Sequence, residues 1–253
     1  MNTSSWELPP ENISIGNGHV HVWRMWLELA DYMTDEMQSK LSTEEKHRAG
    51  RFRGREDRIR FIAAHHFTRE ILSNYLDKRP EKINIAYNQY GKPELEEYDD
   101  ASGLRFNLSH SDDIAVLAVG RWFNVGVDIE RVKHNAAIED IARRFFSSGE
   151  VELFLSQPEN IRDEAFFRCW TRKEAYIKAR GKGMSIPLDQ FEVSFLPGEP
   201  PKMISIMGDS EAAARWSLFH LVPGDGYIGA LAVEGHPDQL TLFQWGEEWG
   251  QNP

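Results

Sequence analysis

The stretch "WTRKEAYIKARGKG", residues 170–183, places a glutamate and two lysines on a predicted helix that ends in a Gly-Lys-Gly exit. At about 100° per residue, Trp170 and Ile177 share one stripe of this helix, and Glu174 lies roughly 40° from its centre. Lys178 follows Glu174 by one turn. A carboxylate drawn toward an aromatic face needs a cation, because burying it alone costs several kcal/mol. Glu174 therefore either forms a surface pair with Lys178, worth about 0.3–0.5 kcal/mol, or binds a metal ion beside a phosphate.

A second pair of carboxylates lies upstream, in "GVDIE" at residues 126–130. Residues two apart share one face of a strand, so Gly126, Asp128 and Glu130 are predicted to face the same way. Neighbouring carboxylates raise each other's pKa unless a cation lies between them. Oxygen ligands at this spacing suit Mg²⁺, which takes one or two carboxylates together with substrate phosphate oxygens. The alternative is the solvated face of a half-buried strand, with Arg131 as the neighbouring cation.

Two further segments carry groups that bind phosphate. In "FNLSHSDD", residues 106–113, Ser109 and His110 point to opposite faces of a strand, so they do not form a Ser–His nucleophile pair. There is no G-x-S-x-G elbow either. His110 is instead a candidate for hydrogen bonding to a phosphate, and the alternative is a plain polar turn.

The other segment is "HRAGRFRGREDRIR", residues 47–60, whose arginine forks match phosphate oxygens. Its six arginines are Arg48, Arg51, Arg53, Arg55, Arg58 and Arg60. Lys92 in the "YGKPEL" turn adds another base. For most of these arginines, the alternative of a solvated helix face paired with nearby acids is favoured.

Composition limits the function classes. The 253 residues suffice for one large domain or two half-size ones, and 41% hydrophobic with 27% charged residues is ordinary for a globular protein. With 40 acidic against 29 basic side chains, the net charge of -11 argues against a general nucleic-acid binder but allows a local basic patch. The single cysteine, Cys169, cannot form an internal disulfide, and we expect it to be a buried small hydrophobe. No signal peptide and no apolar run of about 20 residues is evident, so we expect a cytoplasmic protein without a membrane contact.

Helices and strands mix in both halves of the chain, which predicts an α+β fold rather than regular βα alternation. Capping boxes at Ser42/Glu45 and Ser147/Glu150 predict the starts of two short helices. Apolar spacing predicts long helices over residues 58–76 and 162–179. Strands are predicted over 20–29, 83–95 (running into a Tyr-Gly-Lys-Pro turn at 90–93), 104–120 (interrupted by a polar turn at 109–113), 124–132, 191–196, 202–207, 215–221 and 227–234. We place a boundary near residue 123, giving halves 1–123 and 124–253.

Taken in order, "YGKP…FNLSHS…VGVDIE…RFFS…WTRKEAYIK…GKG" resembles the 4′-phosphopantetheinyl transferases of the Sfp type. The likeness runs from about Ser42 to Val193, and "GVDIE" with "W-x-x-K-E-A-x-x-K" is highly specific. The resemblance implies a monomer of two similar α+β halves related by a pseudo-twofold axis, with coenzyme A in the cleft between them. It implies Mg²⁺-dependent transfer of the phosphopantetheine arm to a serine of an acyl or peptidyl carrier protein, with Mn²⁺ as a possible substitute. The other product would be adenosine 3′,5′-bisphosphate.

The resemblance also implies roles for individual residues. Asp128, Glu130 and Glu174 match metal-binding acids, Glu130 being the one that some relatives lack. Glu174 also matches the general base for the carrier serine, and Lys178 matches the lysine near the pyrophosphate and the attacking hydroxyl. Asp128, Glu174 and Lys178 are therefore the expected catalytic residues.

The same resemblance assigns the coenzyme A contacts. His110 matches a histidine on the phosphates and Ser109 its neighbour at the nucleotide. Lys92, Arg48 and Arg53 match bases at the 3′-phosphate. The chain departs from the family at Glu45, where some members have lysine.

Two other functions remain open from the sequence: a metal-dependent phosphohydrolase of coenzyme A or a nucleotide, and a carrier-binding module without catalysis. Products formed with and without carrier would separate the hydrolase from the transferase. The presence of all four residues Asp128, Glu130, Glu174 and Lys178 argues against a decayed site. Because carrier proteins are usually acidic, we expect a local apolar and basic docking surface near the cleft.

Overall fold

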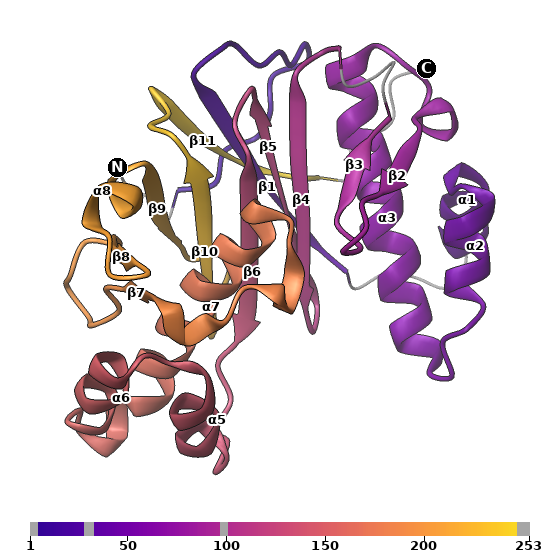
Figure 1. Cartoon of the computed structure of the whole chain (residues 1–253). Coiled ribbons are helices and arrows are strands. Elements are labelled where there is room, and N and C mark those ends of the chain that lie inside the picture. Colours follow the sequence, from indigo (N-terminus) through magenta and orange to yellow (C-terminus); the bar gives the residue numbers. More distant parts are fainter. Residues whose placement is uncertain (1–4, 28–32, 97–100, 247–253) are drawn as a thin grey trace.

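The computed structural model describes residues 5–27, 33–96 and 101–246, in which two sheets pack against each other between two long helices (Figure 1). The first sheet has the order β11-β1-β5-β4. Its strands are β1 (His19–Trp26), β4 (Leu104–Ser111), β5 (Ile114–Arg121) and β11 (Gln239–Gln244). The β1–β11 pairing is parallel and the others are antiparallel, so a segment near the C-terminus completes the sheet of the N-terminal half.

The second sheet is antiparallel throughout, with the order β6-β10-β9. Its strands are β6 (Val125–Arg131), β9 (Trp216–Leu221) and β10 (Tyr227–Glu234). Two small hairpins complete the described strands: β2 (Ile85–Tyr87) with β3 (Pro93–Leu95), and β7 (Phe191–Val193) with β8 (Met203–Ile206).

Each sheet carries a helix of 22 residues on its outer face, α3 (Arg55–Leu76) on the first and α7 (Glu159–Arg180) on the second. The shorter helices are α1 (Met33–Lys40), α2 (Thr43–Ala49), α5 (Ile138–Phe145), α6 (Ser148–Leu155) and α8 (Ser210–Ala214). Single 3₁₀ turns lie at Pro80–Lys82, Gly183–Ser185 and Leu188–Gln190. The predicted α+β fold of two similar halves is thus confirmed. The position of a boundary near residue 123 stays a prediction.

Local signals placed several elements correctly. Ser42 and Ser147 form the two predicted capping boxes at α2 and α6. Of the strand predicted over 20–29, β1 is observed to Trp26, and residues 28 and 29 lie outside the described residues. The sequence did not indicate α1 or α5, each of eight residues. Within the described ranges, no helix combines the length and apolar character needed to cross a bilayer.

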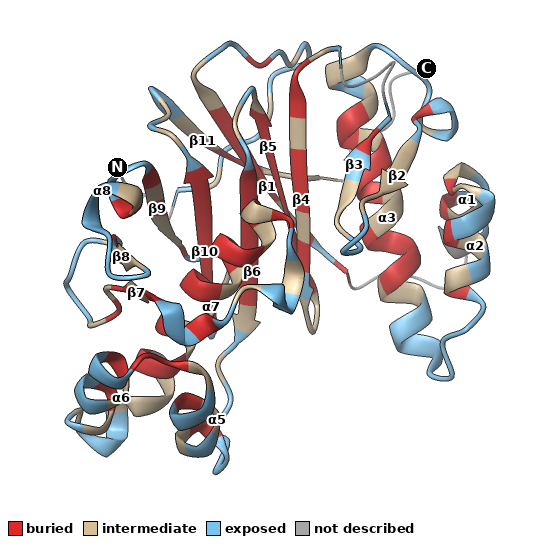
Figure 2. Cartoon of the chain, viewed as in Figure 1, coloured by how far each residue is buried: buried red, intermediate tan, exposed pale blue. Residues whose placement is uncertain are grey.

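The two sheets are joined by an apolar layer that strand alternation predicts. Val125, Val127 and Ile129 of β6 pack in one cluster with residues of β1 and β5. Figure 2 shows β5 and β10 buried along nearly their whole length, since each is covered on both faces. The opposite face of β6, which carries Gly126 and Asp128, is therefore left for α7.

β4 and β6 are the facing edges of the two sheets, and side chains replace a backbone ladder between them. The Val127 N–H donates to Asn107 Oδ1 at 2.8 Å, and the Arg131 N–H donates to Ser111 Oγ at 3.1 Å. The Val127 bond satisfies an edge N–H group that would otherwise be buried without a partner. We call this contact of β4 with β6 the seam.

Helix α7 lies directly on β6, and Gly126 permits the approach. A Cβ added at Gly126 would lie 2.1 Å from the Ala175 carbonyl oxygen and 2.2 Å from the Ala179 nitrogen. Both atoms are backbone and cannot turn away as a flexible side chain would. The glycine of "GVDIE" thus allows the short distance between α7 and β6.

We expect Gly126→Ala to lower the free energy of unfolding by about 3 kcal/mol or more, because α7 must move off β6 to admit the methyl group. Urea unfolding followed by circular dichroism measures this change. Gly149→Ala is the matched control, since its added Cβ would meet only Glu192 Oε1 at 3.5 Å. That substitution lies in α6 and should stabilise by about 0.5–1 kcal/mol. Equal effects of the two substitutions would contradict the close contact.

Candidate active site at the junction of the two halves

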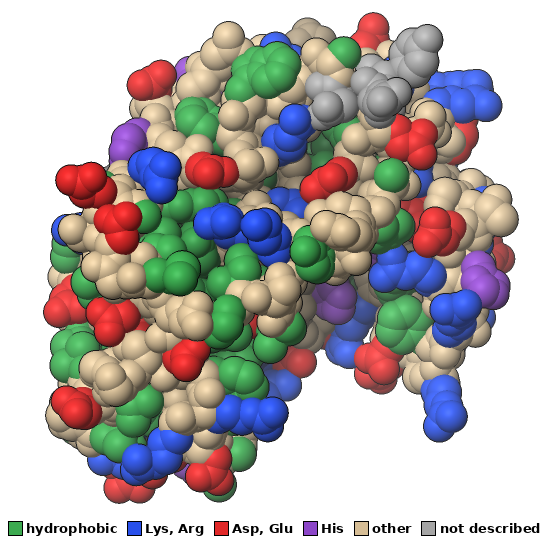
Figure 3. Space-filling model, viewed as in Figure 1, with side chains coloured by type: hydrophobic (Ala, Val, Ile, Leu, Met, Phe, Trp, Pro, Cys, Tyr) green, Lys and Arg blue, Asp and Glu red, His purple; other side chains and the backbone are tan. Residues whose placement is uncertain are grey.

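The candidate site lies where the seam meets α7. Ser109 and Ser111 come from β4, Asp128 and Glu130 from β6, and Lys178 from α7. Figure 3 shows this face of the molecule hollowed between the lobe that contains α5 and α6 and the lobe that contains α2 and α3. Basic and histidine side chains gather on the wall toward α2 and α3.

Asp128 is the buried centre of the site, with 5% of its surface exposed. Its Oδ1 accepts from Lys178 Nζ at 2.6 Å and from Ser109 Oγ at 3.1 Å. Lys178 Nζ also donates to Ser109 Oγ at 2.9 Å, which closes a triangle. Burial raises the pKa of Asp128, although Lys178 and Ser109 act in the opposite direction. Lys178 is therefore the cation that offsets part of the cost of burying this carboxylate.

The second oxygen of Asp128, Oδ2, is buried and has no hydrogen-bond partner among the described residues. A buried carboxylate oxygen without a partner is costly, so Oδ2 is a candidate position for a bound cation. Glu130 lies two positions on, and its Oε2 accepts from Ser111 Oγ at 3.0 Å. Burial, and then the charge of Asp128, raise the pKa of Glu130.

Glu174 lies half-buried on α7, and no hydrogen bond to its carboxylate is found within the described ranges. Burial raises its pKa, and the charges of Asp128 and Glu130 raise it further, against the effect of Lys178. The negative charges of Asp128 and Glu130 therefore raise the pKa of neighbouring carboxyl groups. The charge of Lys178 lowers the pKa of all three acids.

The oxygen atoms of these three carboxylates are of the chemical type that binds a divalent cation. Carboxylate oxygens are the ligands that Mg²⁺ prefers, and one Lys178 leaves two excess negative charges when all three acids are ionised. Across residues 5–27, 33–96 and 101–246, however, no three side chains of the His, Cys, Asp or Glu types converge as ligands around one point. Lys178 holds Asp128 instead, so a bound cation would require Lys178 to move.

His110 lies near Lys178 and Arg60, since the charges of both act on its imidazole. The His110 side chain is exposed, and partial desolvation together with the charges of Lys178 and Arg60 lowers its pKa. Arg60 Nη2 donates to Asp113 Oδ1 at 2.7 Å. Arg60 was predicted to belong to the basic run but not to the site. The sequence did contain a signal that distinguishes Arg60 from the other arginines. Arg60 precedes the apolar residues Ala64 and Phe67 by four and seven positions, so it shares the buried face of α3.

Ser111 was also missed, because residues 109–113 were predicted to be a turn. β4 instead runs through Ser111, and the turn to β5 consists of Asp112 and Asp113. Asp112 adopts a left-handed backbone, with φ of 44°. Polar residues are tolerated in this strand since Ser109 and Ser111 both face the acids of β6.

The other predicted phosphate contacts lie apart from Asp128. The Arg48 guanidinium stands over the rings of Phe61 at 5.5 Å and Tyr87 at 4.9 Å. Arg53 is exposed in the turn before α3. Lys92 Nζ donates to the carbonyls of Val125 and Ala179, about 10 Å along β6 from Asp128.

The acid that departs from the family pattern, Glu45, faces inward. Glu45 Oε2 accepts from Arg69 Nε at 2.7 Å and from the Ser42 N–H at 2.7 Å, in a pair that is almost fully buried. Glu45 therefore holds α2 against α3 and does not face the hollow.

Comparison with known proteins gives a consistent family. A family model described as "4′-phosphopantetheinyl transferase superfamily" matches residues 124–232, and one described as "4′-phosphopantetheinyl transferase, N-terminal" matches residues 27–121. The chain is 38% identical to 4′-phosphopantetheinyl transferase HetI of Nostoc sp., over 95% of this chain and 98% of that protein. It is 28% identical to 4′-phosphopantetheinyl transferase Sfp of Bacillus subtilis, over 87% and 94%. It is 33% identical to 4′-phosphopantetheinyl transferase ffp of Bacillus subtilis, over 86% and 93%.

We expect Glu174→Gln to raise the free energy of unfolding at pH 7 by about 1 kcal/mol, as at other sites where function opposes stability. The folded-state pKa of Glu174 lies above the usual 4.5, so the ionised group costs stability once pH rises through 4.5. The gain should therefore vanish below pH 4.5, where the carboxyl is protonated in both states. Urea unfolding across pH 4–8 measures this.

Glu152→Gln, at an exposed position of α6, is the control and should change stability little at any pH. A loss of stability in Glu174→Gln at pH 7, or a gain that persists at pH 4, would contradict the mutual repulsion of the three acids.

Proposed function

The chain belongs to the 4′-phosphopantetheinyl transferase superfamily, and we propose that it transfers the 4′-phosphopantetheine arm of coenzyme A to a serine of an acyl or peptidyl carrier protein. In this proposal the reaction depends on Mg²⁺ and releases adenosine 3′,5′-bisphosphate. The observation that carries it is the unpartnered, buried Oδ2 of Asp128, with Glu130 and Glu174 beside it. A monomeric state and a cytoplasmic location stay predictions.

In the proposed site, Asp128, Glu130 and Glu174 hold the divalent cation. Bound there, the cation would neutralise charge on the pyrophosphate oxygens of coenzyme A. Mn²⁺, which also accepts carboxylate and water ligands, is expected to substitute. Ser109 orients Asp128 and Lys178, since its hydroxyl touches both.

The proposed chemistry assigns a proton to Glu174. The carrier serine Oγ forms a bond to the phosphorus that bears the pantetheine arm, and the P–O bond to adenosine 3′,5′-bisphosphate breaks. The serine proton passes to the Glu174 carboxylate, directly or through water. A raised pKa suits this role, because a carboxylate with an ordinary pKa is a weak base at neutral pH.

Lys178 and His110 would stabilise the negative charge that develops on the phosphoryl oxygens. Lys178 has a side chain 28% exposed, so its ammonium can leave Asp128 for a phosphate without leaving the site. Fixed N–H donors aimed at a reacting phosphoryl group contribute most of such catalysis. We assign the 3′-phosphate to Arg48, Arg53 and Arg60 as its bases.

The proposal is tested by the intact mass of an apo carrier protein incubated with this chain, coenzyme A and Mg²⁺. We expect a gain of about 340 Da, one phosphopantetheine arm, that EDTA abolishes. Consumption of coenzyme A with no gain on fatty-acid, polyketide or peptide carriers would favour the hydrolase. Neither a gain nor consumption on any of the three carriers would favour a binding module.

In the same assay, Asp128→Asn should lower the initial rate by at least about 100-fold, because it removes the charge that binds both the cation and Lys178. Glu152→Gln should retain the wild-type rate. Equal rates for the two variants, with both folded by circular dichroism, would show that the site is elsewhere.

A further inference from the structure

A turn from the first half of the chain fastens the end of α7. Residues 88–92 connect β2 to β3, and Asn88 orders this turn by accepting the N–H groups of Tyr90 and Lys92 at Oδ1. The amide of the same side chain, Asn88 Nδ2, donates to the Gly181 carbonyl at 3.0 Å. Gly181 ends α7 in a left-handed conformation, with φ of 64°. One side chain therefore links the turn to the end of the helix.

Lys92 makes the second fastening. Its Nζ donates to the Ala179 carbonyl at 3.1 Å and to the Val125 carbonyl at 3.2 Å. The last carbonyls of a helix lack partners within the helix, and a cation there also complements the helix dipole. A Cβ added at Gly181 would lie 3.0 Å from Lys92 Cδ, so the stem of the lysine packs against the helix end.

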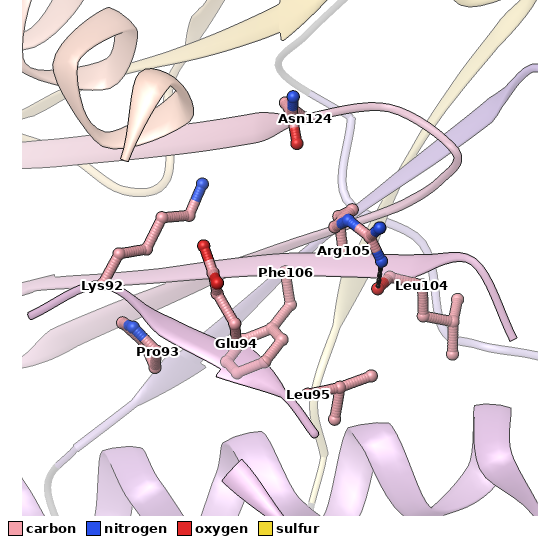
Figure 4. A pocket seen from close by; sticks show the side chains of 8 residues that line it. All are labelled: Lys92, Pro93, Glu94, Leu95, Leu104, Arg105, Phe106 and Asn124. Atoms are coloured by element: carbon pink, nitrogen blue, oxygen red, sulfur yellow. Dashed lines mark hydrogen bonds between the residues drawn. The ribbon is translucent and has the colours of Figure 1, made fainter. Parts of the chain in front are cut away.

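Figure 4 shows the Lys92 side chain extending from the turn before β3 toward β6, with the Glu94 carboxylate beside it. A cavity of about 160 Å³ borders the same side chain, and Arg105 and Asn124 also line it. Burial lowers the pKa of Lys92 to about 8, although the charge of Glu94 acts in the opposite direction. Two of the three N–H donors of the ammonium are already used by carbonyls.

The two carbonyls that Lys92 joins belong to the two segments that form the site. Ala179 directly follows Lys178 on α7, and Val125 begins β6 three residues before Asp128. We propose that Lys92 is a positioning residue, a latch that fixes α7 on β6 so that Lys178 meets Asp128, and that it is not a ligand of the coenzyme A 3′-phosphate. The kinetic part of this inference rests on the proposed function.

The test compares Lys92→Met with Lys82→Met, an exposed lysine of the same half of the chain. The latch predicts hydrogen exchange at least about 10-fold faster in residues 175–183 of Lys92→Met and unchanged exchange there in Lys82→Met. Asn88→Ala removes the other fastening and should loosen the same residues. Unchanged exchange in Lys92→Met would overturn the latch.

Kinetics with coenzyme A and 3′-dephospho-coenzyme A separate positioning from phosphate binding. Well below its Tm, Lys92→Met should lose at least about 10-fold in kcat while the ratio of kcat/KM for the two substrates stays within about 2-fold of wild type. A merely structural lysine would lower Tm and leave kcat unchanged, which would overturn the proposal. A collapse of that ratio, with kcat retained, would show that Lys92 binds the phosphate.

Arg60→Met is the comparison variant in which the ratio should fall. A wild-type chain that modifies no carrier would refute the proposed function, and the exchange of residues 175–183 would still decide the latch.

Discussion

The close approach of α7 to β6 at Gly126 is the constraint on which the site depends. Backbone atoms of Ala175 and Ala179 occupy the space that a side chain at residue 126 would need. Both alanines are almost fully buried, so small residues on the helix meet the absent side chain on the strand. Lys178 lies between these two alanines on α7, and its Nζ reaches Asp128 Oδ1, two residues along β6 from Gly126, at 2.6 Å. One contact between α7 and β6 therefore involves five residues of the two motifs: Gly126, Asp128, Ala175, Lys178 and Ala179.

A buried ion pair and two hydrogen bonds of Lys173 fix another side of α7. Lys173 is fully buried, pairs with Glu150 at 2.6 Å and donates to the carbonyls of Leu188 and Phe191. Its neighbour Glu174 lies close to Asp128, Glu130 and Lys178 of the site. Two consecutive charged residues of α7 therefore face different surroundings. One anchors α7 in the C-terminal half, and the other keeps a charge where burial and like charges oppose it. Removing one partner of a buried pair such as Lys173–Glu150 costs about 3–5 kcal/mol, which shows how much stability supports this placement.

Strand alternation was enough to predict that Gly126 and Asp128 face away from Val127 on β6. The structure confirms this separation, since Val127 packs in the apolar layer and Gly126 faces α7. The helix caps could also be predicted, because a capping box depends only on two residues three positions apart in the sequence. The seam was not predictable, because Asn107 and Ser111 pair with a strand whose proximity only the tertiary fold provides. Lys92 was assigned to a phosphate by resemblance, and its bonds go to backbone carbonyls, which carry no sequence signature. The metal-binding and catalytic roles of the acids stay predictions.

We propose that the carboxylates at the seam form a divalent-cation site and that a bound cation displaces Lys178 from Asp128. The most direct measurement is the anomalous diffraction of a crystal grown with Mn²⁺ and coenzyme A. We predict a manganese peak bonded to Asp128 and to Glu130 or Glu174, with Lys178 Nζ displaced toward the pyrophosphate. A map without a peak at Asp128, and with Lys178 still paired to its Oδ1, would contradict the account.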